Sequence, residues 1–266
     1  MLVNIDGRNL RYDILGDEAG PVVCMAHCLS FDSGVWAEQV PPLLAAGWRV
    51  LRLDMRGHGG SDAGPEDCTM SMLAQDAASI LDALDISKVH FVGVSIGGMI
   101  GQVFGIEHSE RVLSLMLCGT APKALDGGME QLWTPRFEAI AQAGSLEPLA
   151  DATMERWVTD AFRERRPERW LQVHRTVCNT SPSGYRGGAL AIDTFDVLDR
   201  LPAITAPTLV LCGDGDTGTP PAGNRQIAEA IPRARYVELP NARHTPMVEY
   251  PELFNGILLD WLEANR

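Results

Sequence analysis

The sequence lacks the patterns that mark several classes of protein. No apolar run approaches the roughly 20 residues that a membrane-spanning helix needs. Residues 1–6 do not combine a basic segment with an apolar one, as the start of a secretory signal peptide does. Lysine and arginine number 22 against 35 aspartates and glutamates, which gives a net charge of −13. Because nonspecific nucleic-acid binding needs a basic surface, we expect no nucleic-acid partner. The lack of a long apolar run leads us to expect no membrane partner.

Metal and cofactor motifs are missing as well. The six cysteines are scattered without a C-x-x-C pair, and there is no H-E-x-x-H. No G-K-[ST] follows the glycines of residues 57–60, so this segment is expected to be a turn rather than a phosphate-binding loop. Several cysteines lie in apolar runs such as 22–25, which is typical of buried, reduced thiols and favours the cytoplasm. We expect no metal and no cofactor.

Short apolar runs alternate with longer segments of helical spacing. Continuous apolar strands are expected in a parallel sheet, because helices cover both of its faces. The expected strands lie at residues 22–26, 50–53, 89–94, 112–117, 208–212 and 235–239. Runs at 2–5 and 10–15 flank the short segment Asp6-Gly7-Arg8 and indicate an antiparallel hairpin at the sheet edge. The pattern predicts an α/β protein with a mostly parallel central sheet flanked by helices.

The alternation stops between residues 122 and 202, where helical spacings continue without a strong strand. Two groups of large apolar residues are each expected to share a helical face: Trp133, Phe137 and Ile140, then Met154, Trp157, Val158 and Phe162. Such an insertion predicts a helical cap over the carboxyl ends of the strands, where open α/β sheets bind ligands. We expect a core of residues 1–121 and 203–266, with 122–202 as an inserted cap rather than an independent domain.

Residues 92–98 contain a G-x-S-x-G motif centred on Ser95. An apolar strand precedes the motif and a helical segment, 97–105, follows it, which is the context of a nucleophile elbow. The glycines are needed because a Cβ would clash in so sharp a turn. The turn exposes Ser95 Oγ at a helix N-terminus, where developing negative charge is favoured. The motif predicts a nucleophilic serine, against the plainer interpretation of a serine in a glycine-rich turn.

A serine hydroxyl needs a base, and the chain order in this architecture is serine, acid, histidine. His244 is the histidine that follows the last expected strand, and we predict that it is the base. Asp214 and Asp216 both follow the strand at 208–212, and spacing physics alone does not separate them.

The expected chemistry also needs two N–H donors for an oxyanion. One should come from Ile96, after the nucleophile, and the other from Leu29, in the loop His27-Cys28-Leu29-Ser30. No side chain of this loop need act, because the donors are main-chain groups.

These segments together resemble the α/β-hydrolase superfamily over almost the whole chain. The resemblance rests on the nucleophile motif, on Asp54-Met55-Arg56-Gly57-His58-Gly59 with Ser61, on Gly213-x-x-Asp216-x-x-Thr219-Pro220, and on His244 with Glu249 and Pro251. The family spacing implies that Asp216 is the acid and that Ser95, Asp216 and His244 form a catalytic triad.

A narrower resemblance is to the 3-oxoadipate enol-lactonases of aromatic compound catabolism. It rests on residues 95–102 and on the cap segments Leu132-Trp133-x-x-Arg136, Arg156-Trp157 and Ser181-Pro182-Ser183-Gly184-Tyr185 leading into 189–192. It implies hydrolysis of an enol-lactone that bears a carboxylate, without a cofactor. The family commonly has Asn-Ser-Leu-Gly where this chain has residues 27–30, a change that keeps the main-chain donor of Leu29 but alters the pocket wall.

Trp133, Arg136, Arg156 and Trp157 are the candidate substrate-binding residues. Arg136 lies three residues after Trp133, so the two are neighbours on a helix surface, and either arginine could bind a substrate carboxylate. The alternative is an arginine that extends along a solvated face of the cap.

The sequence therefore predicts a serine hydrolase that opens a small carboxylate-bearing lactone through an acyl-enzyme. The expected partner is a small-molecule ester or lactone, and a homo-oligomer is left open. A general carboxylesterase or perhydrolase, or a C–C bond hydrolase, on the same triad is the alternative, and a receptor-like hydrolase is less favoured. Serine at position 95 disfavours a haloalkane dehalogenase, whose nucleophile is a carboxylate.

Overall fold

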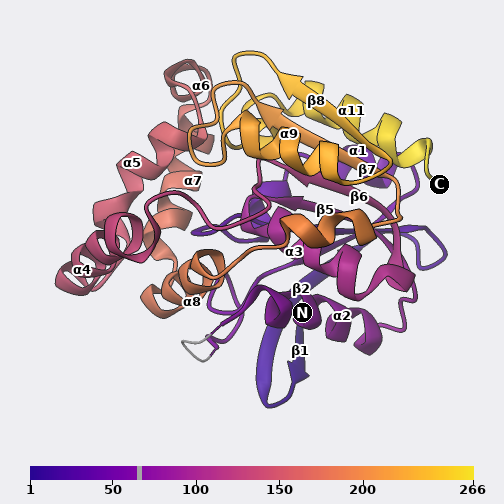
Figure 1. Ribbon diagram of the computed structural model, residues 1–266, viewed down its shortest axis with the longest axis horizontal. Coiled ribbons are helices and arrows are strands. Elements are labelled where there is room, and N and C mark those ends of the chain that lie inside the picture. Colours follow the sequence, from indigo (N-terminus) through magenta and orange to yellow (C-terminus); the bar gives the residue numbers. More distant parts are fainter. Residues whose placement is uncertain (65–67) are drawn as a thin grey trace.

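The computed structural model describes residues 1–64 and 68–266, and in these residues eight strands form one sheet (Figure 1). The strands are β1 (Leu2–Ile5), β2 (Arg8–Leu15), β3 (Val22–Ala26), β4 (Arg49–Leu53), β5 (Val89–Val94), β6 (Val112–Cys118), β7 (Thr208–Gly213) and β8 (Ala234–Leu239). Their order is β1-β2-β4-β3-β5-β6-β7-β8. β1, β2 and β4 pair antiparallel, and every other neighbouring pair is parallel. The predicted α/β class with a mostly parallel sheet is confirmed.

The hairpin at the sheet edge closes with a two-residue turn. Asp6 and Gly7 have φ values of 50° and 81°, the positive pair that matches the twist of two antiparallel strands. Asn4 supports the turn, because its side-chain oxygen accepts a hydrogen bond from Gly7 N–H at 3.1 Å. Arg8, expected in the turn, is instead the first residue of β2, where it pairs with Ile5.

Both faces of the sheet are covered by helices, which explains the continuous apolar strands. All five residues of β3 are buried. Cys24 belongs to the core beneath α2 (Met70–Ala83), α3 (Ile96–Glu107) and α9 (Pro221–Ala230). Its neighbours Val23 and Met25 belong to the core beneath α1 (Val40–Ala45) and α11 (Pro251–Glu263). Burying each such side chain contributes about 1.5–3 kcal/mol, so the central strands are mostly apolar, and a polar residue there needs a hydrogen-bond partner.

Between β6 and β7, helices occupy most of residues 122–203; we call residues 122–202 the cap segment. The helices are the π-helical turn η3 (Gly128–Trp133), α4 (Thr134–Ala143), α5 (Glu147–Trp157), α6 (Asp160–Arg165), α7 (Pro167–Asn179), α8 (Pro182–Asp193) and the 3₁₀ turn η4 (Leu198–Ala203). Figure 1 shows α4 to α8 gathered beyond one end of the sheet. The remaining short helices are η1 (Ser33–Trp36), η2 (Ser109–Arg111) and α10 (Pro246–Glu249).

The prediction that Met154, Trp157, Val158 and Phe162 share one helical face is wrong. Met154 and Trp157 are buried on α5, but that helix ends at Trp157 and the backbone of Val158 is extended. The chain restarts at Thr159, whose side-chain oxygen caps α6 by accepting a hydrogen bond from Phe162 N–H. A helix-capping threonine in this position ends the apparent periodicity, so Phe162 reaches the core from a separate helix.

Helix α8 packs directly against the loops at the carboxyl ends of β3 and β4. A Cβ added to Gly184 would lie 2.0 Å from the carbonyl oxygen of Gly57. A Cβ added to Gly188 would lie 2.6 Å from Leu29 Cδ1. Because the atoms close to Gly184 are backbone, only glycine permits the approach there, whereas at Gly188 the Leu29 side chain would have to move; α8 therefore packs closely beside Leu29.

Two buried histidines are held in their neutral form. His90 Nδ1 lies 2.9 Å from Ser114 Oγ, and its ring packs edge-on against Trp48 with 5.1 Å between centroids. Burial lowers the pKa of His90 to about 4. Burial, together with the nearby His27, lowers the pKa of His58 to about 3. Both values lie below the ordinary histidine pKa of 6.5.

These histidines predict a loss of stability in mild acid. As the pH falls from about 6.5 towards 4, the unfolded chain binds protons at His58 and His90 whereas the folded protein does not. The free energy of unfolding should therefore fall by up to about 1.4 kcal/mol per pH unit for each histidine. Urea unfolding of the wild type and of His90→Gln, followed across this range, tests the prediction, since the variant should lose stability less steeply. An unchanged slope in His90→Gln would contradict it.

Candidate active site

Ser95 lies in the sharp turn between β5 and α3, with φ 58° and ψ −120°. The turn is possible because glycines surround it: a Cβ on Gly93 would lie 2.1 Å from the carbonyl oxygen of Gly97, and one on Gly97 would lie 2.3 Å from that of Ala26. Ser95 N–H donates to the carbonyl of Cys118 at 2.9 Å, which ties the turn to β6. The elbow therefore presents Ser95 to the cavity above the sheet.

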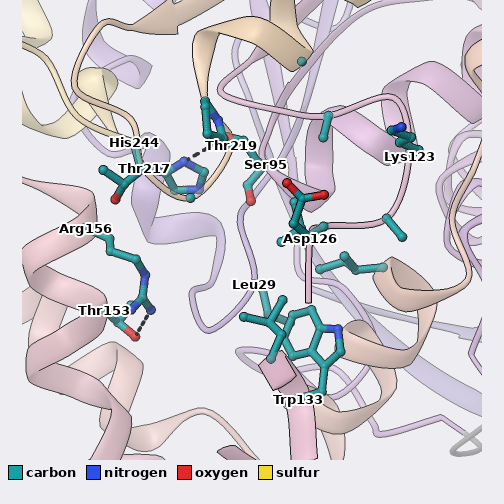
Figure 2. Close-up of a pocket in the computed structure, with 18 of the residues that line it drawn as sticks. Leu29, Ser95, Lys123, Asp126, Trp133, Thr153, Arg156, Thr217, Thr219 and His244 are labelled. Atoms are coloured by element: carbon teal, nitrogen blue, oxygen red, sulfur yellow. Dashed lines mark hydrogen bonds between the residues drawn. The ribbon is translucent and has the colours of Figure 1, made fainter. Parts of the chain in front are cut away.

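The structure brings His244 to Asp216. His244 Nδ1 lies 2.8 Å from Asp216 Oδ2, and both residues are buried, whereas Asp214 is exposed. An Nδ1–H that donates to the carboxylate leaves Nε2 as the basic nitrogen of the ring. Burial alone would raise the pKa of the Asp216 carboxyl. The charge of His244, the hydrogen bond with His244 and the two hydrogen bonds from Thr219 together lower this pKa below its ordinary value. Ser95 and His244 line the same cavity (Figure 2).

The loop that carries His244 is fixed to the cap segment. Glu249, quoted above for the family resemblance, is buried, and its carboxylate accepts hydrogen bonds from the hydroxyl and the N–H of Thr159. Thr245 adds to this contact, since its N–H and its hydroxyl both donate to the carbonyl of Trp157, at 3.1 and 3.0 Å. His244 is therefore positioned by groups on α10 and on the cap.

A buried chain of hydrogen bonds, which the sequence analysis missed, joins the serine turn to the acid loop. The Thr120 hydroxyl donates to the carbonyl of Ser95 at 2.8 Å, and Thr120 N–H donates to Asn224 Oδ1 at 3.0 Å. Asn224 Nδ2 donates to the carbonyl of Thr219 at 2.9 Å. The Thr219 hydroxyl then donates to Asp216 Oδ2 at 2.9 Å. Thr219 stood in the acid motif, but nothing in the sequence marked Asn224, because it acts from the first turns of α9.

The two expected oxyanion donors are available. Within residues 1–64 and 68–266, the N–H groups of Leu29 and Ile96 donate to no other backbone carbonyl or side chain. Leu29 lines the cavity, and Ile96 begins α3, whose first N–H groups have no partner inside the helix. His27 fixes the loop from below, because its Nδ1 bonds the carbonyl of Cys28 at 2.8 Å and its Nε2 accepts from Met55 N–H at 3.0 Å.

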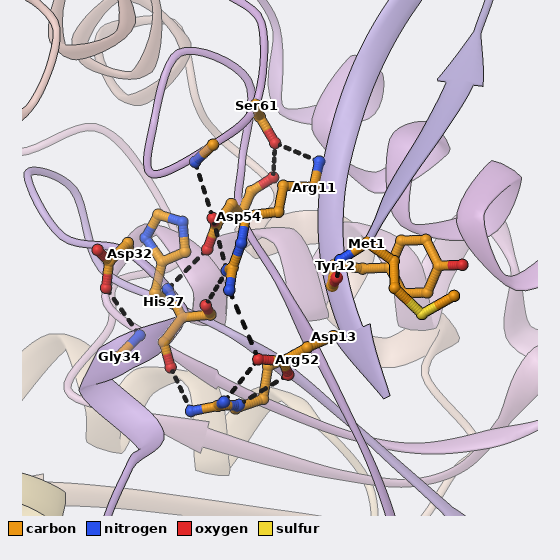
Figure 3. A network of polar contacts seen from close by, with 12 residues as sticks. Met1, Arg11, Tyr12, Asp13, His27, Asp32, Gly34, Arg52, Asp54 and Ser61 are labelled. Carbon is orange, nitrogen blue, oxygen red and sulfur yellow. Dashed lines mark hydrogen bonds and ion pairs between the residues drawn. The ribbon is translucent and has the colours of Figure 1, made fainter. Parts of the chain in front are cut away.

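Asp54 anchors the far side of the same loop (Figure 3). Its carboxylate accepts hydrogen bonds from Ser33 N–H at 2.8 Å and Gly60 N–H at 3.0 Å, and it pairs with the Arg11 guanidinium at 2.9 Å. Burial alone would raise the pKa of the Asp54 carboxyl, but the charge of the neighbouring His27 and the hydrogen bonds from Gly60 and Ser33 hold it below its ordinary value. The Asp54-to-Ser61 motif is therefore a support for the Leu29 loop rather than a phosphate-binding loop.

The cavity has a volume of about 500 Å³ and is lined by all four expected substrate-binding residues, Trp133, Arg136, Arg156 and Trp157. The Arg136 guanidinium lies 5.3 Å from the centre of the Trp133 ring, and Arg156 Nη2 donates to Thr153 Oγ1 at 3.1 Å. In the described part of the chain neither arginine pairs with a carboxylate. Burial, and then the charge of Arg136, lowers the pKa of Arg156. Among the described residues, the two arginines therefore face the cavity without an ion-pair partner.

The remaining residues that could take part in chemistry are possible metal ligands, cysteines and further residues of the cavity lining. Among the described residues no group of three histidine, cysteine or acidic side chains is placed to hold a metal ion, and no helix is long and apolar enough to cross a membrane. All six cysteines are free thiols, and Cys178 is the least buried of them. Lys123 and Asp126, which were not expected at the site, line the cavity as exposed residues.

Comparison with known proteins agrees with this architecture. Residues 21–251 match the family model described as the alpha/beta hydrolase fold, and the chain belongs to this family. It is 32% identical to 3-oxoadipate enol-lactonase 1 of Acinetobacter baylyi, over 99% of this chain and 97% of that protein. The crystal structure of the enol-lactonase from Burkholderia xenovorans LB400 superposes with a TM-score of 0.93 at 34% identity, over 99% and 100% of the two chains.

A further solved structure, that of a thermophilic esterase from Thermogutta terrifontis with malate bound, is similar with a TM-score of 0.89 at 27% identity, over 99% of this chain and 96% of that one. Together, these relatives indicate that the protein is a hydrolase of lactone or ester bonds.

The Thr219 hydroxyl is predicted to matter for catalysis. Thr219→Val keeps the shape of the side chain but removes the hydrogen bond to Asp216. Without this hydrogen bond Asp216 holds His244 less firmly, and we expect the transition state to lose about 1.4 kcal/mol of stabilisation. This loss should lower kcat roughly tenfold and leave KM unchanged. Steady-state ester or lactone hydrolysis measures the effect, and Thr219→Ser, which keeps the hydroxyl, is the matched control. Equal kcat values for the valine and serine variants would refute this role.

Proposed function

We propose that the protein hydrolyses a small lactone bearing a carboxylate, through an acyl-enzyme formed on Ser95. The observation that carries the proposal is the 2.8 Å hydrogen bond between His244 and Asp216 in the wall of a cavity that Ser95 also lines. Nucleophile, base and orienting acid are the three parts that serine-based acyl transfer needs. Arg136 and Arg156, which form no ion pair among the described residues, support a substrate with a negative charge.

In the first step, His244 Nε2 takes the proton of the Ser95 hydroxyl, and Ser95 Oγ forms a bond to the lactone carbonyl carbon. The carbonyl oxygen becomes an oxyanion and accepts hydrogen bonds from the N–H groups of Leu29 and Ile96. Asp216 keeps the imidazole in the required tautomer and stabilises the imidazolium. The C–O bond of the ring then breaks. For an enol-lactone the leaving group is an enolate, which takes the proton from His244 Nε2 and becomes a ketone, so that Nε2 is again free to accept a proton.

In the second step, a water molecule gives a proton to His244 Nε2, and its oxygen attacks the acyl carbon. The bond to Ser95 Oγ breaks, Oγ recovers the proton from His244, and the carboxylic acid leaves. All of the groups required belong to this chain. Six free thiols support the further proposal that the reaction takes place in the cytoplasm.

The likeness to two enol-lactonases supports a substrate similar to 3-oxoadipate enol-lactone. A guanidinium binds a carboxylate with two parallel hydrogen bonds, and Arg136 and Arg156 are available for this role. A general carboxylesterase is the second candidate, because the esterase of Thermogutta terrifontis shares the fold over nearly the whole chain and because the 500 Å³ cavity has room for larger acyl groups.

The first test follows the ultraviolet absorbance of the enol-lactone with purified enzyme, beside a panel of neutral p-nitrophenyl esters. We expect the lactone to be consumed with a much higher kcat/KM than the esters, and Ser95→Ala to lower kcat by a factor of roughly 10⁴ or more, as the loss of a triad nucleophile does. Ester cleavage that depends on Ser95, without turnover of the lactone, would replace the lactonase by the carboxylesterase. Undiminished activity in Ser95→Ala would refute both.

The proposed binding of a substrate carboxylate by the arginines is tested by comparing anionic with neutral substrates. Arg136→Gln and Arg156→Gln should each raise KM for an anionic lactone by about tenfold, since a charge-assisted hydrogen bond contributes about 1.5–3 kcal/mol. KM for a neutral ester should not change. Arg163→Gln is the matched control, because Arg163 stacks on Trp170 away from the cavity lining. A similar rise for neutral and anionic substrates would mean that the arginines only maintain the shape of the cap.

A further inference from the structure

Two serines with a positive φ, Ser30 and Ser95, line the active-site cavity. Among the described residues, the non-glycine residues with positive φ are Asp6, Ser30, Asp85, Ser95 and Asn241. The two aspartates and the asparagine are exposed, and these residue types tolerate the conformation. Ser95 forms the nucleophile turn described above. Ser30 has φ 66° although it is only 4% exposed, and serine lacks the preference for this conformation that glycine and asparagine have.

The surroundings of Ser30 hold it in this conformation. It is the third residue of a tight turn from Cys28 to Phe31, closed by a hydrogen bond from Phe31 N–H to the Cys28 carbonyl at 3.2 Å. Glycine or asparagine is the usual residue at a third position with positive φ. Ser30 N–H donates to His58 Nε2 at 3.4 Å, and that nitrogen can accept because His58 is neutral and its Nδ1 bonds the Arg56 carbonyl at 3.0 Å. A strained residue that its neighbours fix in place is typical of functional sites.

The Ser30 hydroxyl has no hydrogen-bond partner among the residues that the structure describes. Across residues 1–64 and 68–266 its Oγ takes part in no hydrogen bond, whereas Ser33 Oγ accepts from Arg11 and Ser61 Oγ donates to the carbonyl of Asp54. Ser30 also lines the cavity, together with Ser95 and Leu29. The free hydroxyl therefore belongs to the residue next to the proposed oxyanion donor.

We propose that Ser30 Oγ–H is a third donor to the oxyanion, beside the N–H groups of Leu29 and Ile96. This inference rests on the proposed chemistry of Ser95 and adds a side chain where the sequence required only main-chain donors. As Ser95 Oγ bonds to the carbonyl carbon, the π electron pair moves onto the carbonyl oxygen, which accepts the hydrogen bond. The proton stays on Ser30 Oγ throughout. Serine at this strained position is then retained for its hydroxyl, which glycine would lack.

The test compares Ser30→Gly with Ser30→Ala. Both remove the hydroxyl, but glycine also relieves the left-handed strain, so Ser30→Gly should have a Tm equal to or above that of the wild type. We expect both variants to lose at least about tenfold in kcat with KM unchanged, as the loss of an interaction made only in the transition state does. Wild-type kcat in a stable Ser30→Gly protein would overturn the inference, because a purely structural serine gains from glycine.

Two controls separate this inference from the proposed function. Asp85→Gly relieves left-handed strain in an exposed turn that does not line the cavity, and it should leave kcat unchanged. Ser95→Ala reports on the proposed function itself. If Ser95→Ala abolishes hydrolysis while Ser30→Gly keeps full activity, only the role of Ser30 is refuted. If Ser95→Ala keeps full activity, the proposed chemistry and the role of Ser30 are both refuted.

Affinity for a phenylboronic acid gives a readout that does not depend on the choice of substrate. Its tetrahedral adduct with Ser95 places an oxygen where the oxyanion would form, so Ser30→Gly should weaken binding by about tenfold. Unchanged affinity in Ser30→Gly would count against the Ser30 contact.

Discussion

The left-handed conformation of Ser95 is the constraint on which the rest of the site depends. An L-residue with φ 58° is strained, and the turn survives because its neighbours leave it no alternative. Gly93 and Gly97 allow the backbone to come closer than any Cβ would permit, and the Cys118 carbonyl accepts the Ser95 N–H. A relaxed turn would move both the hydroxyl and the first N–H groups of α3, so nucleophile and oxyanion donor are set by one backbone geometry.

The polar groups behind this turn extend the same constraint to the other half of the site. Thr120 and Asn224 are fully buried, and their hydrogen bonds leave the Ser95 carbonyl and the acid loop little freedom to move apart. Buried polar networks are costly when a partner is missing and rigid when every partner is present. We infer that this chain fixes the separation between the serine and the Asp216–His244 pair, although the three residues come from loops after different strands.

Much of this arrangement could be predicted from local patterns, and the reason is physical. The apolar strands and the G-x-S-x-G turn are local features, because burial on both sheet faces and the clash of a Cβ act on neighbouring residues. The choice between Asp214 and Asp216 needed either a family resemblance or three-dimensional coordinates, since both follow the same strand. Asn224 and the break at Val158 could not be predicted, because a long-range hydrogen bond and a helix cap decided them. The strain at Ser30 is invisible in a sequence that contains only an ordinary serine.

The whole protein is negatively charged, whereas two arginines place positive charge in the cavity. The chain carries a net charge of −13, yet in its described residues Arg136 and Arg156 face the cavity without a carboxylate partner, and their like charges repel each other. Partly buried cations without a counter-ion reduce the stability of the folded protein, so we expect such a pair to be retained only where a bound anion neutralises its charge. A substrate carboxylate would do so at the moment of binding. The surrounding negative charge would slow the approach of an anion, whereas the two arginines act within the cavity, where the low dielectric strengthens their attraction. Recognition of an anion by this protein is therefore expected to depend on short-range contacts with the arginines rather than on long-range attraction.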